Sequence, residues 1–129
     1  MKILVADDDN TFRSLVNEIL TDAGYKVSPH ENGRLAWEYL QAEGADMAVL
    51  DINMPEMDGI ELLSHIRADD RFKNIPVIML TIRAFTEDQI QGYECGADDY
   101  LTKPFSNDVL IARVKVLERR ILGKGSTRS

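Results

Sequence analysis

Short apolar runs alternate along the chain with segments whose apolar residues recur at helical spacing. The runs have the length of buried strands and cover residues 3–6, 47–50, 75–80 and 99–102. The helical patterns cover residues 10–23, 33–42 and 59–68. Five apolar residues share one face of the first helix and are predicted to be core: Phe12, Leu15, Val16, Ile19 and Leu20. Strands that alternate with helices predict an α/β fold with a parallel sheet covered on both faces.

Three glycines divide this pattern at corresponding points. Each follows a helical stretch and precedes an apolar run, where a helix commonly ends on a left-handed residue: Gly24, Gly44 and Gly96. A capping-box pattern from Thr86 to Gln89 predicts a fourth helix, and a fifth helix is expected from near Ser106 to near Leu122. We therefore predict one domain over residues 1–122, with residues 123–129 as a flexible tail or the start of a linker.

The composition restricts the classes of function. A formal net charge of -7 argues against direct binding of nucleic acid or of an anionic membrane, because both require a basic face. One cysteine and two histidines exclude an internal disulfide and a zinc site of ordinary ligand count. No apolar stretch approaches the ~20 residues that span a bilayer, and the amino terminus lacks an apolar signal core. We expect a cytoplasmic chain whose partners are other proteins.

Polar side chains stand where the predicted strands end. Asp7 and Asp8 follow the first strand, and Asp51 ends the third. Thr81 ends the fourth strand and Lys103 follows the fifth. Ligands of doubly wound sheets bind outside the carboxyl ends of the strands. Carboxylates gathered there repel one another, whereas a bound divalent cation makes the same cluster favourable. The pattern therefore predicts a metal site with a lysine beside it for an anion such as a phosphoryl group.

Each of these residues also has an ordinary structural interpretation. A run of aspartates is typical of a solvated face or of a helix N-cap, which we predict at Asp9 or Asn10. Asp51 would also suit the start of a turn, and Lys103 before a proline would suit the end of a strand. Their joint position at one edge of the sheet favours the functional interpretation.

Four motifs at these strand ends resemble the receiver domain of two-component response regulators. They are ILVADDD at 3–9, DINMPEMDG at 51–59, LT at 80–81 and GADDYLTKPF at 96–105. The resemblance extends from Lys2 to about Leu122. It implies a flavodoxin-like, doubly wound, five-stranded parallel sheet of order 2-1-3-4-5 with five helices.

The resemblance also implies a chemistry. Asp51 would take a phosphoryl group from a histidine kinase or phosphotransfer protein, with Mg²⁺ as cofactor. Asp8, Asp51 and the backbone carbonyl of Asn53 would hold the ion directly, and Asp7 would hold it through water. Lys103 would bind an oxygen of the transferred group. Self-phosphorylation and self-dephosphorylation are the reactions expected, so the chain would not be an enzyme.

The same resemblance implies a switch. Thr81, which would also contact the phosphoryl group, and Tyr100 match the family's switch pair. Their rearrangement would alter the surface of the fourth helix, fifth strand and fifth helix, where an output domain or downstream protein binds. Asn53 and Arg83 stand at positions that tune how long the phosphoryl group persists. Ile82 departs from the small residue usual there.

Other interpretations remain open at this stage. One branch of the family, in which receivers are fused to winged-helix DNA-binding domains, dimerises through charged residues where this chain has Gln89, Gln91 and Val109. The resemblance therefore leaves dimerisation open. A haloacid-dehalogenase-like, metal-dependent phosphohydrolase would also use Asp51 as nucleophile, but it would have an acid in place of Asn53. A metal-free protein-interaction module is the second alternative to a receiver. The cognate kinase and the output domain are not predicted.

Overall fold

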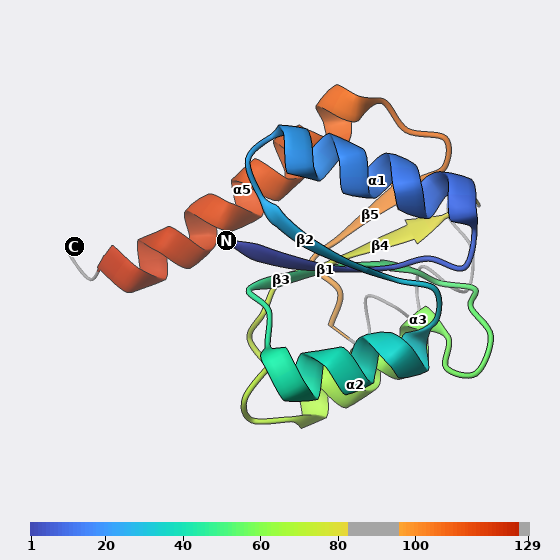
Figure 1. Cartoon of the computed structure of the whole chain (residues 1–129). Coiled ribbons are helices and arrows are strands. Elements are labelled where there is room, and N and C mark those ends of the chain that lie inside the picture. Colours follow the sequence, from blue (N-terminus) through green and yellow to red (C-terminus); the bar gives the residue numbers. More distant parts are fainter. Residues whose placement is uncertain (83–95, 127–129) are drawn as a thin grey trace.

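The computed structural model describes residues 1–82 and 96–126 (Figure 1). Five parallel strands form one sheet in the order β2-β1-β3-β4-β5. The strands are β1 (Lys2–Ala6), β2 (Lys26–His30), β3 (Met47–Asp51), β4 (Val77–Thr81) and β5 (Asp99–Thr102). The predicted α/β class and strand order are confirmed.

Helices cover both faces of the sheet. α1 (Asn10–Asp22) and α5 (Asn107–Ser126) lie on one face, and α2 (Gly33–Glu43) and α3 (Gly59–Ala68) lie on the other (Figure 1). The predicted fourth helix, from Thr86, falls outside the described residues. α5 ends at Ser126 rather than near Leu122, because a glycine costs a helix only about 1 kcal/mol and does not by itself end it. The domain limit at residue 122 stays a prediction.

Alternate residues of the central strands supply two apolar layers. Ile3 and Val5 pack towards α1 and α5, whereas Leu4 and Ala6 pack towards α2 and α3. All residues of β3 and β4 are buried, as expected for parallel strands with helices on both sides. The prediction of Leu15 as core is wrong, since it is 36% exposed. Leu15 lies on the shoulder of the apolar stripe of α1, in a shallow groove between α1 and α5.

The helix ends follow the sequence signals. Gly24, Gly44 and Gly96 have positive φ angles of 99°, 75° and 101°, as predicted. Asp9 is the N-cap of α1, and its side chain accepts hydrogen bonds from the amides of Thr11 and Phe12. These ends fix where each strand begins and therefore which residues reach the carboxyl edge of the sheet.

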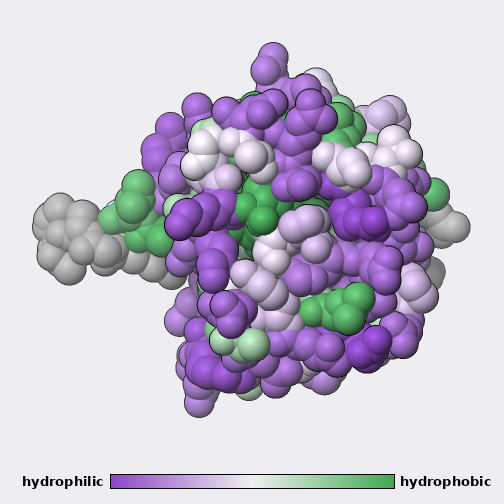
Figure 2. Space-filling model, viewed as in Figure 1, coloured by the Kyte–Doolittle hydropathy of each residue, from purple (hydrophilic) through white to green (hydrophobic). Residues whose placement is uncertain are grey.

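Figure 2 shows that one side of the surface is mainly hydrophilic, with small and separate apolar spots. One spot lies over the far end of α5, where Leu122 is 64% exposed. Among the helices that the structure describes, none combines the length and apolar character needed to cross a membrane.

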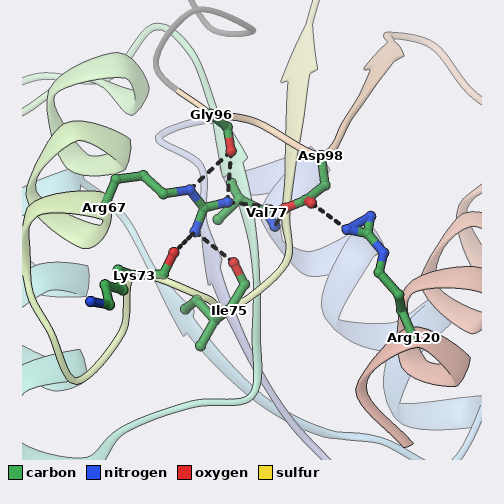
Figure 3. A network of polar contacts seen from close by, with 7 residues as sticks. All are labelled: Arg67, Lys73, Ile75, Val77, Gly96, Asp98 and Arg120. Carbon is green, nitrogen blue, oxygen red and sulfur yellow. Dashed lines mark hydrogen bonds and ion pairs between the residues drawn. The ribbon is translucent and has the colours of Figure 1, made fainter. Parts of the chain in front are cut away.

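Arg67, near the end of α3, holds the beginnings of β4 and β5 together (Figure 3). Its guanidinium donates to the carbonyl oxygens of Gly96 (2.9 and 2.7 Å), Lys73 (3.1 Å) and Ile75 (2.7 Å). It also donates to Asp98 Oδ2 at 3.0 Å. The side chain of Arg67 is 21% exposed, so these bonds are shielded from water.

Asp98 extends the same network to the other face of the sheet (Figure 3). Its Oδ2 accepts from the amide of Val77 at 2.8 Å, and its Oδ1 pairs with Arg120 of α5 at 2.7 Å. One carboxylate therefore joins α3, β4 and α5 at the edge of the sheet where the strands begin.

Tyr25 connects the end of α1 to α5 and provides a prediction about alkaline stability. Its hydroxyl donates to Glu118 Oε1 at 2.8 Å, and the residue is 8% exposed. Burial, followed by the hydrogen bond and charge of Glu118, raises the pKa of Tyr25 to about 12. An unfolded tyrosine titrates near pH 10, so the neutral native form loses stability as pH rises from about 10 to about 12. We expect Tyr25→Phe to lose about 1 to 2 kcal/mol less unfolding free energy than wild type over this pH range.

Urea unfolding of wild type and Tyr25→Phe across this pH range measures the difference. Tyr39→Phe serves as the control, because it removes a tyrosine hydroxyl elsewhere in the chain. Identical pH slopes in wild type and Tyr25→Phe would contradict the assignment.

Candidate functional site

Three carboxylates meet at the carboxyl edge of the sheet. One oxygen from each of Asp7, Asp8 and Asp51 lies within 4.8 Å of the other two. The register pairs Ala6 of β1 with Leu50 of β3, which places the next residues, Asp7 and Asp51, side by side. Asp7 is fully buried and Asp51 is 7% exposed, whereas Asp8 is open to solvent. The structure therefore brings together the three acids that the sequence singled out.

Lys103 joins the acids from the end of β5. Its Nζ lies 2.8 Å from Asp7 Oδ2 and 3.7 Å from Asp51 Oδ1, and its side chain is 4% exposed. The same ammonium lies 4.4 Å from the centroid of the Phe12 ring, within the range of a cation–π contact. The Lys103–Pro104 peptide bond is cis. The ammonium is thus held between two carboxylates and an aromatic face.

The charges at this site do not balance. Three carboxylates face one ammonium, and two of those carboxylates are shielded from water. Burial, followed by the charge of Asp7, raises the pKa of the Asp51 carboxyl to about 7, although Lys103 opposes the shift. A divalent cation would offset the excess negative charge and favour ionised Asp51. Because every donor is a carboxylate oxygen and Asp8 leaves one side open, the residues fit a hard divalent cation.

The remaining predicted site residues lie at different depths. Thr81 ends β4, is 1% exposed, and its carbonyl accepts from the amide of Lys103 at 2.6 Å. Tyr100 of β5 is 8% exposed and belongs to the apolar layer under α2 and α3. Asn53 is exposed on the loop between β3 and α3. Ile82 is 67% exposed, and Arg83 lies outside the described residues.

Sequence reasoning did not find two residues beside the acids. Arg13 of α1 donates from Nη1 to the carbonyl oxygen of Asp7 at 2.9 Å, and it also contacts Asn10. Phe12, predicted only as core, supplies the ring beside Lys103. Neither position has a charge pattern that points to the site. Their only signal is that the first turn of α1 follows Asp7 and Asp8 directly.

The first residue of α3 approaches the site closely. A Cβ added to Gly59 would lie 2.2 Å from the carbonyl oxygen of Asp51, so a side chain could not fit without moving the backbone. The amide of Gly59 donates to the carbonyl oxygen of Ile52 at 2.8 Å. The loop between Asp51 and α3 is therefore fixed at its far end.

The sequence of this chain is similar to those of known regulatory and chemotaxis proteins. The sequence profile of the "response regulator receiver domain" family matches residues 3–115. The regulatory protein VanRc of Enterococcus gallinarum is 43% identical over 119 residues, which cover 92% of this chain and 50% of that protein. The chemotaxis protein CheY1 of Helicobacter pylori J99 is 42% identical over 120 residues, covering 91% of this chain and 96% of that protein.

Solved structures show the same architecture. The receiver domain of the Francisella response regulator 1452 matches with a TM-score of 0.85 and 39% identity, covering 93% of this chain and 98% of that one. The Vibrio cholerae chemotaxis protein CheY4 matches with a TM-score of 0.85 and 34% identity, covering 90% and 97%. This chain spans about half the length of VanRc but nearly all of CheY1, so its relatives include proteins about twice as long and proteins of similar length.

Proposed function

The chain belongs to the response regulator receiver domain family, and on that premise we propose that Asp51 is its phosphoryl acceptor. Receiver domains are, in general, signalling modules and not enzymes. They interact with histidine kinases and output domains. The observation that carries the proposal is the position of Asp51. It ends β3 beside Asp7 and Asp8, with the ammonium of Lys103 at 3.7 Å.

The proposed reaction moves a phosphoryl group from a histidine of a kinase or phosphotransfer protein to Asp51. A carboxylate oxygen of Asp51 attacks phosphorus, the nitrogen–phosphorus bond breaks, and its electron pair stays on the donor imidazole. The product is an acyl phosphate on Asp51. Lys103, held beside both Asp7 and Asp51, provides a positive charge for an oxygen of the transferred group.

Magnesium is the cation proposed for the acidic cluster. Asp8, Asp51 and the backbone carbonyl of Asn53 would hold Mg²⁺, with Asp7 acting through water. When bound, the ion supplies positive charge that offsets the charge on the phosphoryl oxygens. Asp51 has to be ionised to attack. Burial, followed by the charge of Asp7, raises the pKa of its carboxyl to about 7 and so works against ionisation near neutral pH.

The signal is proposed to leave through Thr81 and Tyr100. The Thr81 hydroxyl would bond to a phosphoryl oxygen, and the ring of Tyr100 would take up a different packing. The equilibrium between two conformations of the surface formed by the fourth helix, β5 and α5 would shift. An output domain or downstream protein would read that surface, where Val109 and Val116 of α5 are 39% and 51% exposed. Arg83 and Asn53 are proposed to set the lifetime of the phosphoryl group.

The chain as a whole is proposed to act in the cytoplasm without binding nucleic acid itself, consistent with its net charge of -7. Residues 1–122 would form the receiver, and residues 123–129 a tail or the start of a linker.

The test replaces Asp51 with asparagine, which keeps the shape of the side chain but removes its nucleophilic oxygen. With Mg²⁺ and acetyl phosphate, we expect intact-mass spectrometry to show one phosphoryl adduct on wild type and none on Asp51→Asn. The adduct should be lost with hydroxylamine and should not form in a chelator. Asp51→Asn should remain folded, because it removes a buried like charge beside Asp7.

Asp70→Asn is the matched control, since its carboxylate is 95% exposed and should label like wild type. Equal labelling of Asp51→Asn and wild type would contradict the proposal. Multiple turnover of a small phosphate ester would support a phosphohydrolase, although Asn53 stands where that class needs an acid. The absence of both adduct and turnover would support a metal-free interaction module.

A further inference from the structure

The loop between β3 and α3 contains a tight turn at Glu56. Its φ angle is 66°, and the amide of Met57 donates to the carbonyl oxygen of Pro55 at 2.7 Å. A three-residue turn with positive φ at its centre is a classic-type γ-turn, which is rare and strained. A non-glycine residue in such a conformation costs about 1 kcal/mol or more. Something in the surrounding structure must hold this glutamate in place.

The carboxylate of Glu56 makes the contacts that can do so. Its Oε2 accepts from Asn32 Nδ2 at 3.0 Å, and its Oε1 lies 3.3 Å from Arg34 Nε. Asn32 is 6% exposed and is the N-cap of α2, where its Oδ1 accepts from the amide of Leu35 at 2.8 Å. Both ends of the Asn32 amide are therefore used, so its orientation is fixed. The turn is attached to a rigid helix end rather than to solvent.

The backbone of the loop also lies directly against α2. A Cβ added to Gly33 would be 2.1 Å from the carbonyl oxygen of Met57 and 2.9 Å from its carbonyl carbon. Only glycine fits such an approach without a backbone shift. The middle of the loop is thus held both by the Glu56 side chain and by backbone packing on α2.

This attachment lies between the acidic cluster and α3. Asp51 begins the loop, and Asp58 ends it as the N-cap of α3, accepting from the amide of Glu61 at 2.8 Å. Asn53, whose carbonyl is a proposed cation ligand, lies between Asp51 and the turn. A loop fixed at both ends and in the middle leaves this carbonyl little freedom. Fixed ligands bind a cation more tightly than mobile ones, because less entropy is lost on binding.

From these contacts we propose that Glu56 is a positioning residue for the divalent cation site, acting through Asn32 and the N-terminus of α2. The inference rests on the proposed function, because it takes the Asp7–Asp8–Asp51 cluster and the Asn53 carbonyl as the cation site. It assigns to Glu56 no contact with the cation itself. Its carboxylate keeps the strained turn closed, and the turn sets the path of the ligand-bearing loop.

The test uses Glu56→Gly and Glu56→Gln in the full chain. Glycine adopts a φ of 66° without strain, so Glu56→Gly keeps the turn accessible but loses its attachment. We expect the Mg²⁺ dissociation constant from calorimetric titration to rise roughly tenfold. The Mg²⁺ concentration for half-maximal adduct formation with acetyl phosphate should rise equally, while the rate at saturating Mg²⁺ changes little. Glu56→Gln keeps an acceptor for Asn32 Nδ2, so we expect it to stay within about twofold of wild type.

Two further measurements separate a positioning role of Glu56 from an effect on folding and from an effect of its ion pair with Arg34. The free energy of unfolding of Glu56→Gly in chelator should remain close to that of wild type, since relief of strain offsets the lost hydrogen bond. Arg34→Ala should bind Mg²⁺ within about twofold of wild type, because that pair is about half exposed.

Wild-type Mg²⁺ affinity in Glu56→Gly would overturn the inference, and so would an equal loss in Glu56→Gln. If wild type itself forms no adduct and binds no Mg²⁺, the proposed function fails and the inference fails with it. If wild type forms the adduct and Glu56→Gly shows the same Mg²⁺ dependence, the inference is overturned and the proposed function stands.

Discussion

Replacing Lys103 with methionine is expected to lower the free energy of unfolding by about 3 to 5 kcal/mol in buffer free of divalent cations. The substitution keeps an unbranched side chain but removes the ammonium that lies 2.8 Å from Asp7. Asp7 is fully buried, so its carboxylate would lose its cation while Asp51 and Asp8 stay close. Urea unfolding at mildly alkaline pH, above the pKa of about 7 of Asp51, measures the loss.

Added Mg²⁺ should restore part of that stability, because a cation in the acidic cluster replaces the missing charge. The double variant Asp7→Asn with Lys103→Met should also recover stability, since it removes both members of the pair. Lys73→Met is the control for a surface pair: Lys73 and Asp70 are 51% and 95% exposed, so its loss should stay below about 1 kcal/mol. A loss of that small size in Lys103→Met would contradict the account of the site.

Arg67→Met is expected to destabilise the fold by about 2 to 4 kcal/mol. The methionine keeps the apolar part of the side chain but leaves the carbonyl oxygens of Gly96 and Ile75 without the guanidinium that now satisfies them. It also takes the arginine of α3 away from Asp98. Urea unfolding of the variant and wild type gives the difference.

Arg120→Met is a matched control on the same carboxylate. Arg120 is 51% exposed and donates to Asp98 Oδ1, whereas Arg67 and the amide of Val77 both bond to Oδ2. Its removal should therefore cost less than about 1 kcal/mol. Equal losses of unfolding free energy in Arg67→Met and Arg120→Met would mean that burial does not determine how much each arginine stabilises the fold.

The sequence predicted most accurately the residues whose positions follow from regular strand and helix patterns. Asp51 and Thr81 end apolar runs, and parallel strands place their carboxyl ends at one edge, so the positions of these residues followed from spacing. The left-handed glycines followed from their position between helix and strand. The roles proposed for Asp51, Thr81, Asn53, Tyr100 and Arg83 came from the resemblance and remain predictions.

The sequence was less informative where tertiary contacts decided the outcome. Leu15 fits the helical spacing of the apolar residues in α1. It lies at the edge of the contact between α1 and α5, where its side chain is exposed. Arg67 bonds to Gly96 and Asp98 about 30 residues away, and no periodicity marks such a contact. The turn at Glu56 is held by Asn32, which precedes it in the chain by more than a helix and a strand.

The most direct measurement identifies the residue that carries the phosphoryl group. Wild type treated with acetyl phosphate and Mg²⁺ would be reduced with borohydride, which converts an aspartyl phosphate to homoserine, and then digested for peptide mass spectrometry. The account predicts homoserine at position 51 and at no other aspartate. Homoserine at Asp7 or Asp8 with Asp51 intact, or no conversion in protein that carries the adduct, would contradict it.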